Sequence, residues 1–428
     1  MADRIRLQVW LKLAVLLAIH SFVCCASLAY LAPYHIFHLF YNDHLWLNAF
    51  FLVAAFSVVS LLFVFCEFSF GYFVGFYFYS MILGYLWLSN FSDLKYNHRL
   101  AEISAAVSAV AFLLPALLIS SPFKSFPLSE RDFQRLLALI LALAVATIAS
   151  SAIYNFRIVG IGEIYHYRDE LRIPSFLRYA IGITSTALLP FAFACFLARD
   201  AWWRAGGALA LLLLFYPITL SKLALFAPLW LVVMATLARL SGARIATILS
   251  LLLPLAAGLL LMIVVQDRAY PFTHLFNLRV GAIPSIAMDV YNDFFARHDL
   301  TWFCQISFSK SFFSCPYQEP LSIVMEKAYG LGNFNASLFA TEGVASVGPW
   351  LAPVSALICG LIIALGNRAS AGLPPRFILI SSAILVQVLV NVPLTTALLT
   401  YGAGALCLLW YVTPRLPENP PGSLQARP

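Results

Sequence analysis

The chain has 428 residues, of which 62% are hydrophobic and only 11% are charged, and its formal net charge is +7. A soluble domain carries roughly 25% charged residues because its surface faces water, so this composition excludes an ordinary soluble protein. The positive charge lies in short loops and forms no long basic tract, which argues against a nucleic-acid partner and indicates a membrane-topology signal.

Apolar runs recur along the chain at the length of membrane-spanning helices. Such helices need roughly 20 residues, whereas barrel strands need about 10 and alternate in polarity. Because backbone groups in lipid must bond within the protein, the sequence predicts an all-α, polytopic membrane bundle of about 12 transmembrane helices. The predicted spans are 10–32, 45–65, 68–89, 103–120, 135–154, 179–198, 204–220, 223–239, 245–265, 347–366, 377–392 and 394–412.

Three assignments leave an alternative open. The basic start of the chain precedes an apolar run longer than that of a usual signal peptide, so we expect a retained first helix rather than a cleaved signal. The spans 204–220 and 223–239 fit either two crossings or a hairpin that does not cross fully. The Asn391–Pro393 step either separates two spans or bends one helix.

Lysine and arginine residues predict the orientation, because they favour cytoplasmic loops. Nearly every short loop on the side of the N-terminus carries one, whereas the short loops 33–44 and 391–393 carry none. Both termini are therefore predicted to be cytoplasmic, and the long loops 155–178 and 267–346 to face the opposite side.

The longer loop contains two amphipathic stretches, Ser285–Phe295 and Leu321–Tyr329. We expect both to form short helices on the bilayer surface. We predict a single transmembrane domain over residues 1–412, followed by a proline-rich, disordered cytoplasmic tail over 413–428.

Motifs for nucleotides and metals are missing from the sequence. It has no Walker loop, dinucleotide-binding glycine motif, HExxH or paired CxxC, so we expect no metal and no other cofactor. Polar residues that could carry chemistry lie mainly in the two long loops.

Basic residues suggest an anion site. The loop 155–178 holds four arginines, and the planar forks of Arg168 and Arg172 suit a phosphate. The alternative is a solvated loop with internal ion pairs. Lys222 lies between two apolar spans, where it is either an anion contact or a lysine that reaches the membrane interface.

Three carboxylates in the longer loop are candidates for proton transfer or sugar binding. Asp289 and Asp293 are four residues apart and share one helical face; the alternative is helix capping with surface solvation. Glu342 lies among small residues at the entrance of the span 347–366, which suits a substrate cleft or simply marks a helix start.

The remaining polar motifs are a cysteine pair and a histidine group. Cys304 and Cys315 would form a disulfide if their side of the membrane is oxidising. We interpret His35, His38 and His44 as interfacial residues, because no carboxylate framework for a metal accompanies them.

Taken in order, several of these stretches resemble the Wzy-type bacterial polymerases of O-antigen and exopolysaccharide repeat units. The likeness covers residues 150–366. It is carried by the ordered motifs Glu163–Arg172, Thr219–Lys222, Arg279–Pro284, Tyr291–Phe295, Pro316–Tyr317, Asn333–Asn335 and Glu342–Gly343. Many relatives have an asparagine before the glycine where this chain has Val347 before Gly348.

The resemblance implies a substrate, an undecaprenyl-diphosphate-linked oligosaccharide at the periplasmic face of the bacterial inner membrane. It also implies that the growing chain leaves its carrier for a sugar hydroxyl of the next lipid-linked repeat. A chain-length regulator and a flippase of the same pathway are implied partners.

Site roles follow from that reaction. Fixed cations would stabilise the departing diphosphate, and the expected ones are Arg168, Arg172, Lys222 and Arg279. The candidate bases for the acceptor hydroxyl are, in order, Glu342, Asp289 and Glu163. The expected substrate contacts are Tyr165, Tyr291, Asn333 and Asn335.

Three other functions remain open, and one of them is a non-catalytic scaffold, which should tolerate the loss of any single outer arginine. An O-antigen ligase would use the same donor with a different acceptor, and a transporter would move a polysaccharide or lipid. Transporters usually place polar groups at mid-membrane in broken helices, whereas this chain has few charges inside its predicted spans. A cleft open to the outer side would favour the enzyme, and a path between the leaflets would favour the transporter.

Overall fold

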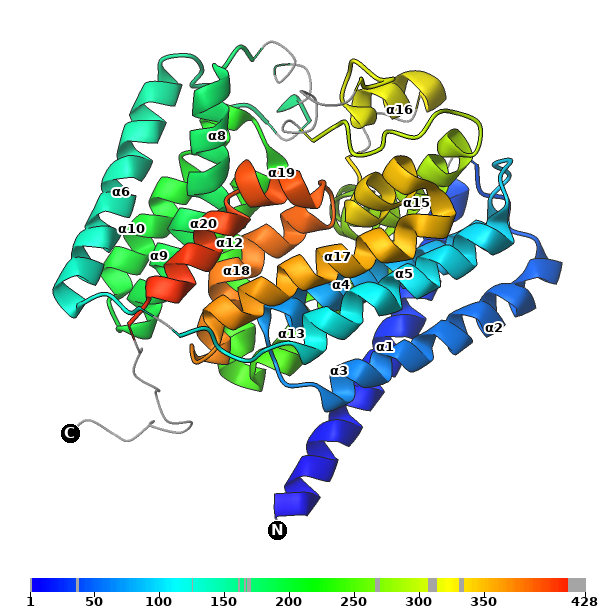
Figure 1. The fold of residues 1–428 in the computed structure, drawn as a ribbon, viewed down its shortest axis with the longest axis horizontal. Helices are drawn as coiled ribbons and strands as arrows, with labels where there is room; N and C mark the ends of the chain where they lie inside the picture. The colour runs from blue at the N-terminus through cyan, green and yellow to red at the C-terminus, as the bar shows by residue number, and fades with distance from the viewer. Residues whose placement is uncertain are drawn as a thin grey trace. The chain divides into compact units, whose positions relative to one another are not determined.

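The computed structural model describes residues 2–35, 38–124, 126–160, 162–164, 167, 171–265, 270–306, 314–330 and 335–414. Within these ranges the chain is helical and contains no β-strand, which confirms the predicted all-α membrane bundle (Figure 1). Nine helices of the described part are long and apolar enough to cross a membrane. They are Arg6–Leu31, Trp46–Phe65, Phe70–Phe91, His98–Leu118, Glu130–Ala152, Ser175–Ala198, Lys222–Ser241, Ala243–Val265 and Phe339–Ser370.

The other three predicted spans form shorter helices than the roughly 20 residues that a crossing needs. Residues 204–220 form α10 (Trp202–Leu213) and α11 (Tyr216–Thr219). Residues 377–392 form α18 (Pro375–Leu389). The last span is interrupted between α19 (Leu394–Leu399) and α20 (Ala403–Val412).

The chain forms two compact units, each of which is built from several segments. Unit 1 contains Met1–Ser120, Ala243–Asn367 and Val386–Ala397. Unit 2 contains Ser121–Gly242, Arg368–Leu385 and Leu398–Pro428.

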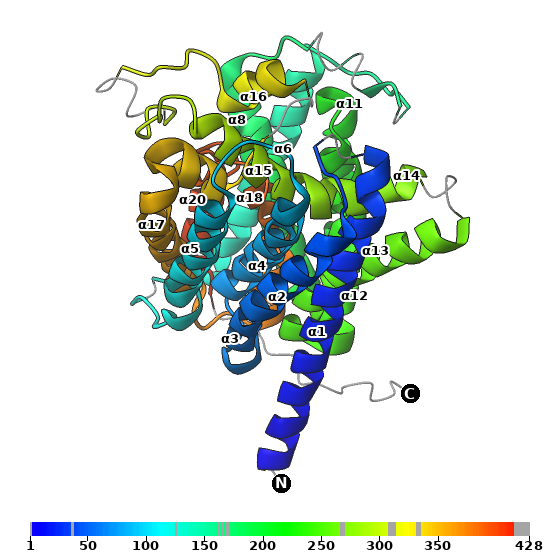
Figure 2. The ribbon, with the colours of Figure 1, turned by 90° about the vertical axis from the view of Figure 1, so that its right-hand side faces the viewer.

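Helix α4 (Phe70–Leu88) is the core of unit 1, and all 19 of its residues are buried. It packs against α1 (Ala2–His35), α2 (Trp46–Ser57), α5 (His98–Leu118) and α13 (Ala243–Val265), and α1 also lies along α13 (Figure 2).

Two polar side chains fix where α4 begins and where it meets α5. The Ser69 hydroxyl accepts from the Tyr72 amide and caps the helix. The Asn367 side chain accepts from the Gly71 amide at 2.6 Å and donates to the Ala116 carbonyl at 2.7 Å. A Cβ at Gly71 would lie 2.0 Å from the Ala116 carbonyl oxygen, so the close approach of these helices requires glycine.

Three π-helical segments interrupt the described α-helices: η4 (Thr184–Leu188), η6 (His274–Ala282) and η8 (Phe339–Ala345). Such widened turns are rare and often lie at functional sites. In unit 1, η6 leads into α15 (Ile283–Phe295), and η8 leads into α17 (Ser346–Ser370), which kinks at Gly348 with φ +73°.

Helix α15 differs from its prediction as a surface helix, because 11 of its 13 residues are buried against neighbours that include α4 and η8. The sequence predicts that its polar residues face solvent, but they form hydrogen bonds inside unit 1. Helix α16 (Leu321–Tyr329), the second amphipathic stretch, keeps several exposed residues.

Unit 2 is built around α6 (Glu130–Ala152), α8 (Ser175–Ile183), α9 (Leu189–Ala198) and α12 (Lys222–Ser241). Within it, η4 packs beside the interruption before α20, where the Thr186 hydroxyl donates to the Tyr401 carbonyl.

Candidate functional site

Three carboxylates are buried in unit 1, on two elements that pack against each other. Asp289 and Asp293 lie on α15, and Glu342 lies on η8. Their exposed fractions are 3%, 1% and 5%, so surface solvation does not explain them. A buried carboxylate needs hydrogen bonds or a counter-ion, and the partners of these three differ.

Within the described part of the chain, the donors to the Asp289 carboxylate are hydroxyl groups. The Ser92 hydroxyl donates to it at 2.6 Å, and the Tyr96 hydroxyl donates to its second oxygen. Burial raises the pKa of Asp289 from 3.8 to about 6, while these two hydrogen bonds act in the opposite direction. Burial and the nearby Tyr85 and Asp289 also raise the pKa of Tyr96.

Asp293 has a full set of partners and therefore suits a structural role. It accepts from the Lys95 amide at 2.9 Å and from the Tyr329 hydroxyl at 2.5 Å, and it forms an ion pair with Arg297. Together these contacts join the segment before α5, helix α15 and helix α16 through one carboxylate.

Glu342 is the one of the three that lies inside a candidate membrane helix, Phe339–Ser370. One oxygen accepts from the Thr341 hydroxyl at 2.5 Å, and the other accepts from the amide and hydroxyl of Thr395, both at 3.3 Å. No lysine or arginine of the described ranges forms an ion pair with it. Ionisable groups in membrane segments are costly and usually functional.

The surroundings of Glu342 are polar and irregular. Thr395 lies in α19, directly after the Asn391–Pro393 turn that the sequence marks as a possible break. The Ser355 hydroxyl donates to the Glu342 carbonyl at 2.7 Å. On α15, burial and the charge of Glu342 raise the pKa of Tyr291. Tyr291 and Glu342, both predicted site residues, therefore lie close together.

The predicted cations divide between the two units. Arg279 is exposed and lies in the last turn of η6, in unit 1. Arg172, which is exposed, and Lys222, the first residue of α12, belong to unit 2. Arg168 lies outside the described residues, so the shared diphosphate site stays a prediction.

In unit 2 the loop that holds the four arginines begins beside the segment that precedes Lys222. The Asn155 side chain donates to the carbonyls of Pro217 and Ile218, both at 3.0 Å, and the Arg157 amide donates to the Pro217 carbonyl at 2.9 Å. The start of the loop 155–178 is therefore bound to the turn that precedes Lys222.

The other predicted residues contribute less to the site. Glu163 is exposed in a turn of unit 2, and Asn335 is exposed in unit 1. Tyr165 and Asn333 lie outside the described residues. Cys304 and Cys315 form a disulfide with their Cα atoms 5.3 Å apart.

Several partners in the site were not singled out in the sequence, namely Ser92, Tyr96, Tyr329 and Thr395. Each is a common residue type whose importance depends on a distant contact. The Tyr96–Asp289 bond, for example, joins residues 193 positions apart. The Asn391–Pro393 turn was a usable signal for the neighbouring Thr395.

Comparisons of the chain with protein-family models, with curated proteins and with solved structures found no match.

Proposed function

We propose that the chain is a membrane glycosyltransferase that polymerises lipid-diphosphate-linked oligosaccharide repeat units, with Glu342 as the base. The observation that carries the proposal is the chemistry around Glu342. Its carboxylate is buried, forms no ion pair within the described residues and accepts from two threonine hydroxyls. A carboxylate in this state can exchange a threonine hydroxyl for a sugar hydroxyl and take its proton.

The reaction then needs few other groups. The acceptor hydroxyl gives its proton to a Glu342 oxygen and attacks the anomeric carbon of the donor. The bond from that carbon to the diphosphate oxygen breaks, and the diphosphate leaves on its lipid carrier. The guanidinium of Arg279, which is always charged and lies in the same unit, suits the stabilisation of this leaving group.

The expected setting is the periplasmic face of a bacterial inner membrane, with undecaprenyl diphosphate as the carrier. An O-antigen ligase would use the same donor and the same leaving group, and would differ in the acceptor alone.

A transporter is the second candidate, and one observation favours it. Glu342 lies in a candidate membrane helix beside the Asn391–Pro393 break, and ionisable groups next to broken helices are typical of transporters.

The test replaces Glu342 by glutamine, which keeps the shape of the side chain but cannot take a proton. We expect E342Q to reduce polymer formation by about 100-fold or more, the range of general-base catalysis. Surface glycan length on gels should change from long chains to single repeats. The control is E319Q, because Glu319 is exposed and forms an ion pair with Lys327 at 2.7 Å, outside the proposed site.

The outcomes separate the candidates when membrane levels of the two variants are equal. Long chains in E342Q would contradict the proposed function. Polymer that accumulates on its lipid carrier would indicate the ligase. Lipid-linked single units confined to the cytoplasmic leaflet would indicate the transporter.

A further inference from the structure

A strained turn follows α15 in unit 1. Trp302 and Phe303 are consecutive non-glycine residues with positive φ, +48° and +63°. L-residues avoid this region because Cβ crowds the backbone, and such residues persist only where their surroundings hold them.

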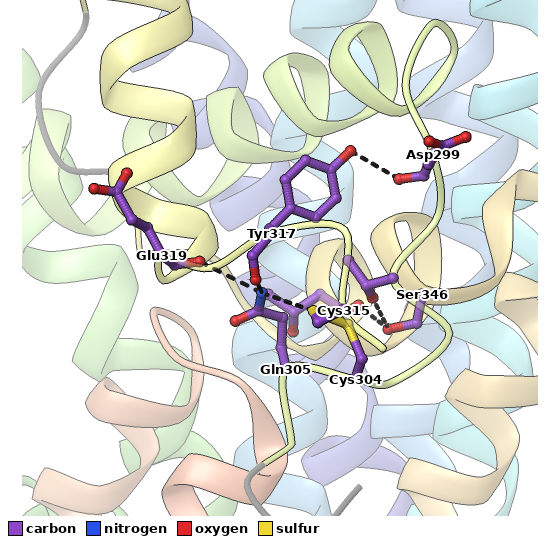
Figure 3. The surroundings of a disulfide bond; sticks show 9 residues. Asp299, Cys304, Gln305, Cys315, Tyr317, Glu319 and Ser346 are labelled. Carbon is purple, nitrogen blue, oxygen red and sulfur yellow. Dashed lines mark hydrogen bonds between the residues drawn. A yellow bond between two sulfur atoms is a disulfide. The ribbon is translucent and has the colours of Figure 1, made fainter. Parts of the chain in front are cut away.

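Hydrogen bonds and a disulfide hold this turn. The Thr301 amide donates to the Ala345 carbonyl at 2.8 Å, and the Trp302 amide donates to the Ser346 carbonyl at 3.1 Å. Cys304 is bonded to Cys315, and Gln305 donates to the Tyr317 carbonyl at 3.3 Å (Figure 3). The turn is thereby attached to the end of η8, three residues after Glu342.

The turn leaves the Trp302 side chain 58% exposed at the edge of a pocket. The pocket has a volume of about 560 Å³ and is open to solvent. Its lining includes His298, Asp299, Ser314 and Cys315. Pockets of this size accommodate small ligands.

Contacts outside the pocket hold two of its polar residues, Asp299 and His298, in place. The Tyr317 hydroxyl donates to the Asp299 backbone carbonyl at 2.8 Å, which does not use the Asp299 carboxylate (Figure 3). The His298 ring stacks on Phe294 at 3.9 Å, and its Nδ1 lies 2.8 Å from the Phe294 carbonyl, which leaves Nε2 for another contact.

This combination suits a sugar. An indole face is electron-rich and packs against the C–H face of a pyranose. The Asp299 carboxylate, the His298 imidazole and the Ser314 hydroxyl can form hydrogen bonds with the hydroxyl groups at the edge of the sugar ring. The Asp299 charge disfavours a diphosphate, so the pocket fits the glycan part of a lipid-linked substrate and not its phosphate part.

We propose that the pocket at Trp302 and Asp299 is a saccharide-binding subsite that holds the oligosaccharide while the reaction proceeds at Glu342. This inference rests on the proposed function and adds the place where the glycan is held. The turn links the two sites, because its amides bond to the segment that follows Glu342.

Binding can be measured by saturation-transfer NMR on the purified full-length protein in detergent. The probe is a set of oligosaccharides released by mild acid from the surface polysaccharide of the source cells. We expect W302A and D299N each to weaken binding at least tenfold. W350A is the control, because Trp350 is 78% exposed on α17 and lines no part of the pocket. Unchanged binding in W302A, or no binding to the unmodified protein, overturns the inference.

Activity separates this inference from the proposed function. W302A should raise the KM for the lipid-linked repeat with little change in kcat, whereas E342Q should lower kcat by about 100-fold or more. If E342Q eliminates polymer while W302A keeps its normal KM, the subsite alone is wrong. If E342Q makes normal polymer, the proposed function is wrong even where W302A weakens saccharide binding.

Discussion

At the scale of single residues, the buried Asp289 carboxyl makes the free energy of unfolding depend on pH. Burial makes the folded protein hold the Asp289 proton more tightly than the unfolded chain does, with a pKa raised from 3.8 to about 6. Its contribution to stability is therefore complete below pH 4 and is lost as the pH rises through 6. The full loss corresponds to about 3 kcal/mol.

We expect D289N to remove this dependence, since an amide does not titrate. Chemical unfolding in detergent would give the free energy of unfolding at pH 4 and at pH 7. The change between the two pH values is then compared between the unmodified protein and the variant. D299N is the control, because Asp299 is exposed. The same fall in stability from pH 4 to pH 7 in D289N would refute the assignment.

At the scale of elements, the contact of α4 with α5 depends on Gly71. A Cβ there would lie 2.0 Å from the Ala116 carbonyl oxygen and would force the two helices apart. We expect G71A to destabilise the protein by about 1–3 kcal/mol, the usual cost of overpacking. Thermal unfolding of the purified protein would measure the change.

The matched control is G206A in α10, where an added Cβ meets nothing within 4 Å. Alanine is the better helix former, so this variant should be as stable as the original or up to about 1 kcal/mol more stable. Equal destabilisation by both substitutions would show that close packing at Gly71 is not the cause.

Sequence patterns predicted the long helices well, because a crossing requires a continuous apolar run whatever its neighbours are. They placed α15 wrongly because the position of a helix with a polar face depends on its neighbours. Asp289, Asn292 and Asp293 give this helix the polar face of a surface helix, but Tyr96, Tyr85 and Tyr329 supply hydroxyl partners inside unit 1.

The candidate site was partly predictable. Glu342 and Tyr291 could be chosen because residue type and position relative to a span indicate function. The Asn391–Pro393 turn marks a break near Thr395, but the contact of Thr395 with Glu342, 53 positions away, could not be predicted, because no local pattern encodes which distant segment will pack against a given side chain.

At the scale of the whole molecule, the positive-inside pattern predicts which ends of the helices face the cytoplasm. Single cysteines at two exposed positions test it. We expect E326C on α16 to react with a membrane-impermeant maleimide added to intact cells, and R131C on α6 to react only after lysis. The reverse pattern would refute the predicted orientation.

Helix α4 has a consequence for biosynthesis. The span Phe70–Phe91, which contains α4, has a mean hydropathy of 1.2, against 2.8 for the span Ala243–Val265, and no residue of α4 is exposed. Its tyrosine hydroxyls bond to groups such as the Phe63 carbonyl and Ser250, which lie outside the helix. Such a helix gains little free energy from contact with lipid if it moves from the translocon into the bilayer by itself. Its release into the bilayer therefore depends on neighbours that are made before and after it, and insertion and folding become one process for this part of the chain.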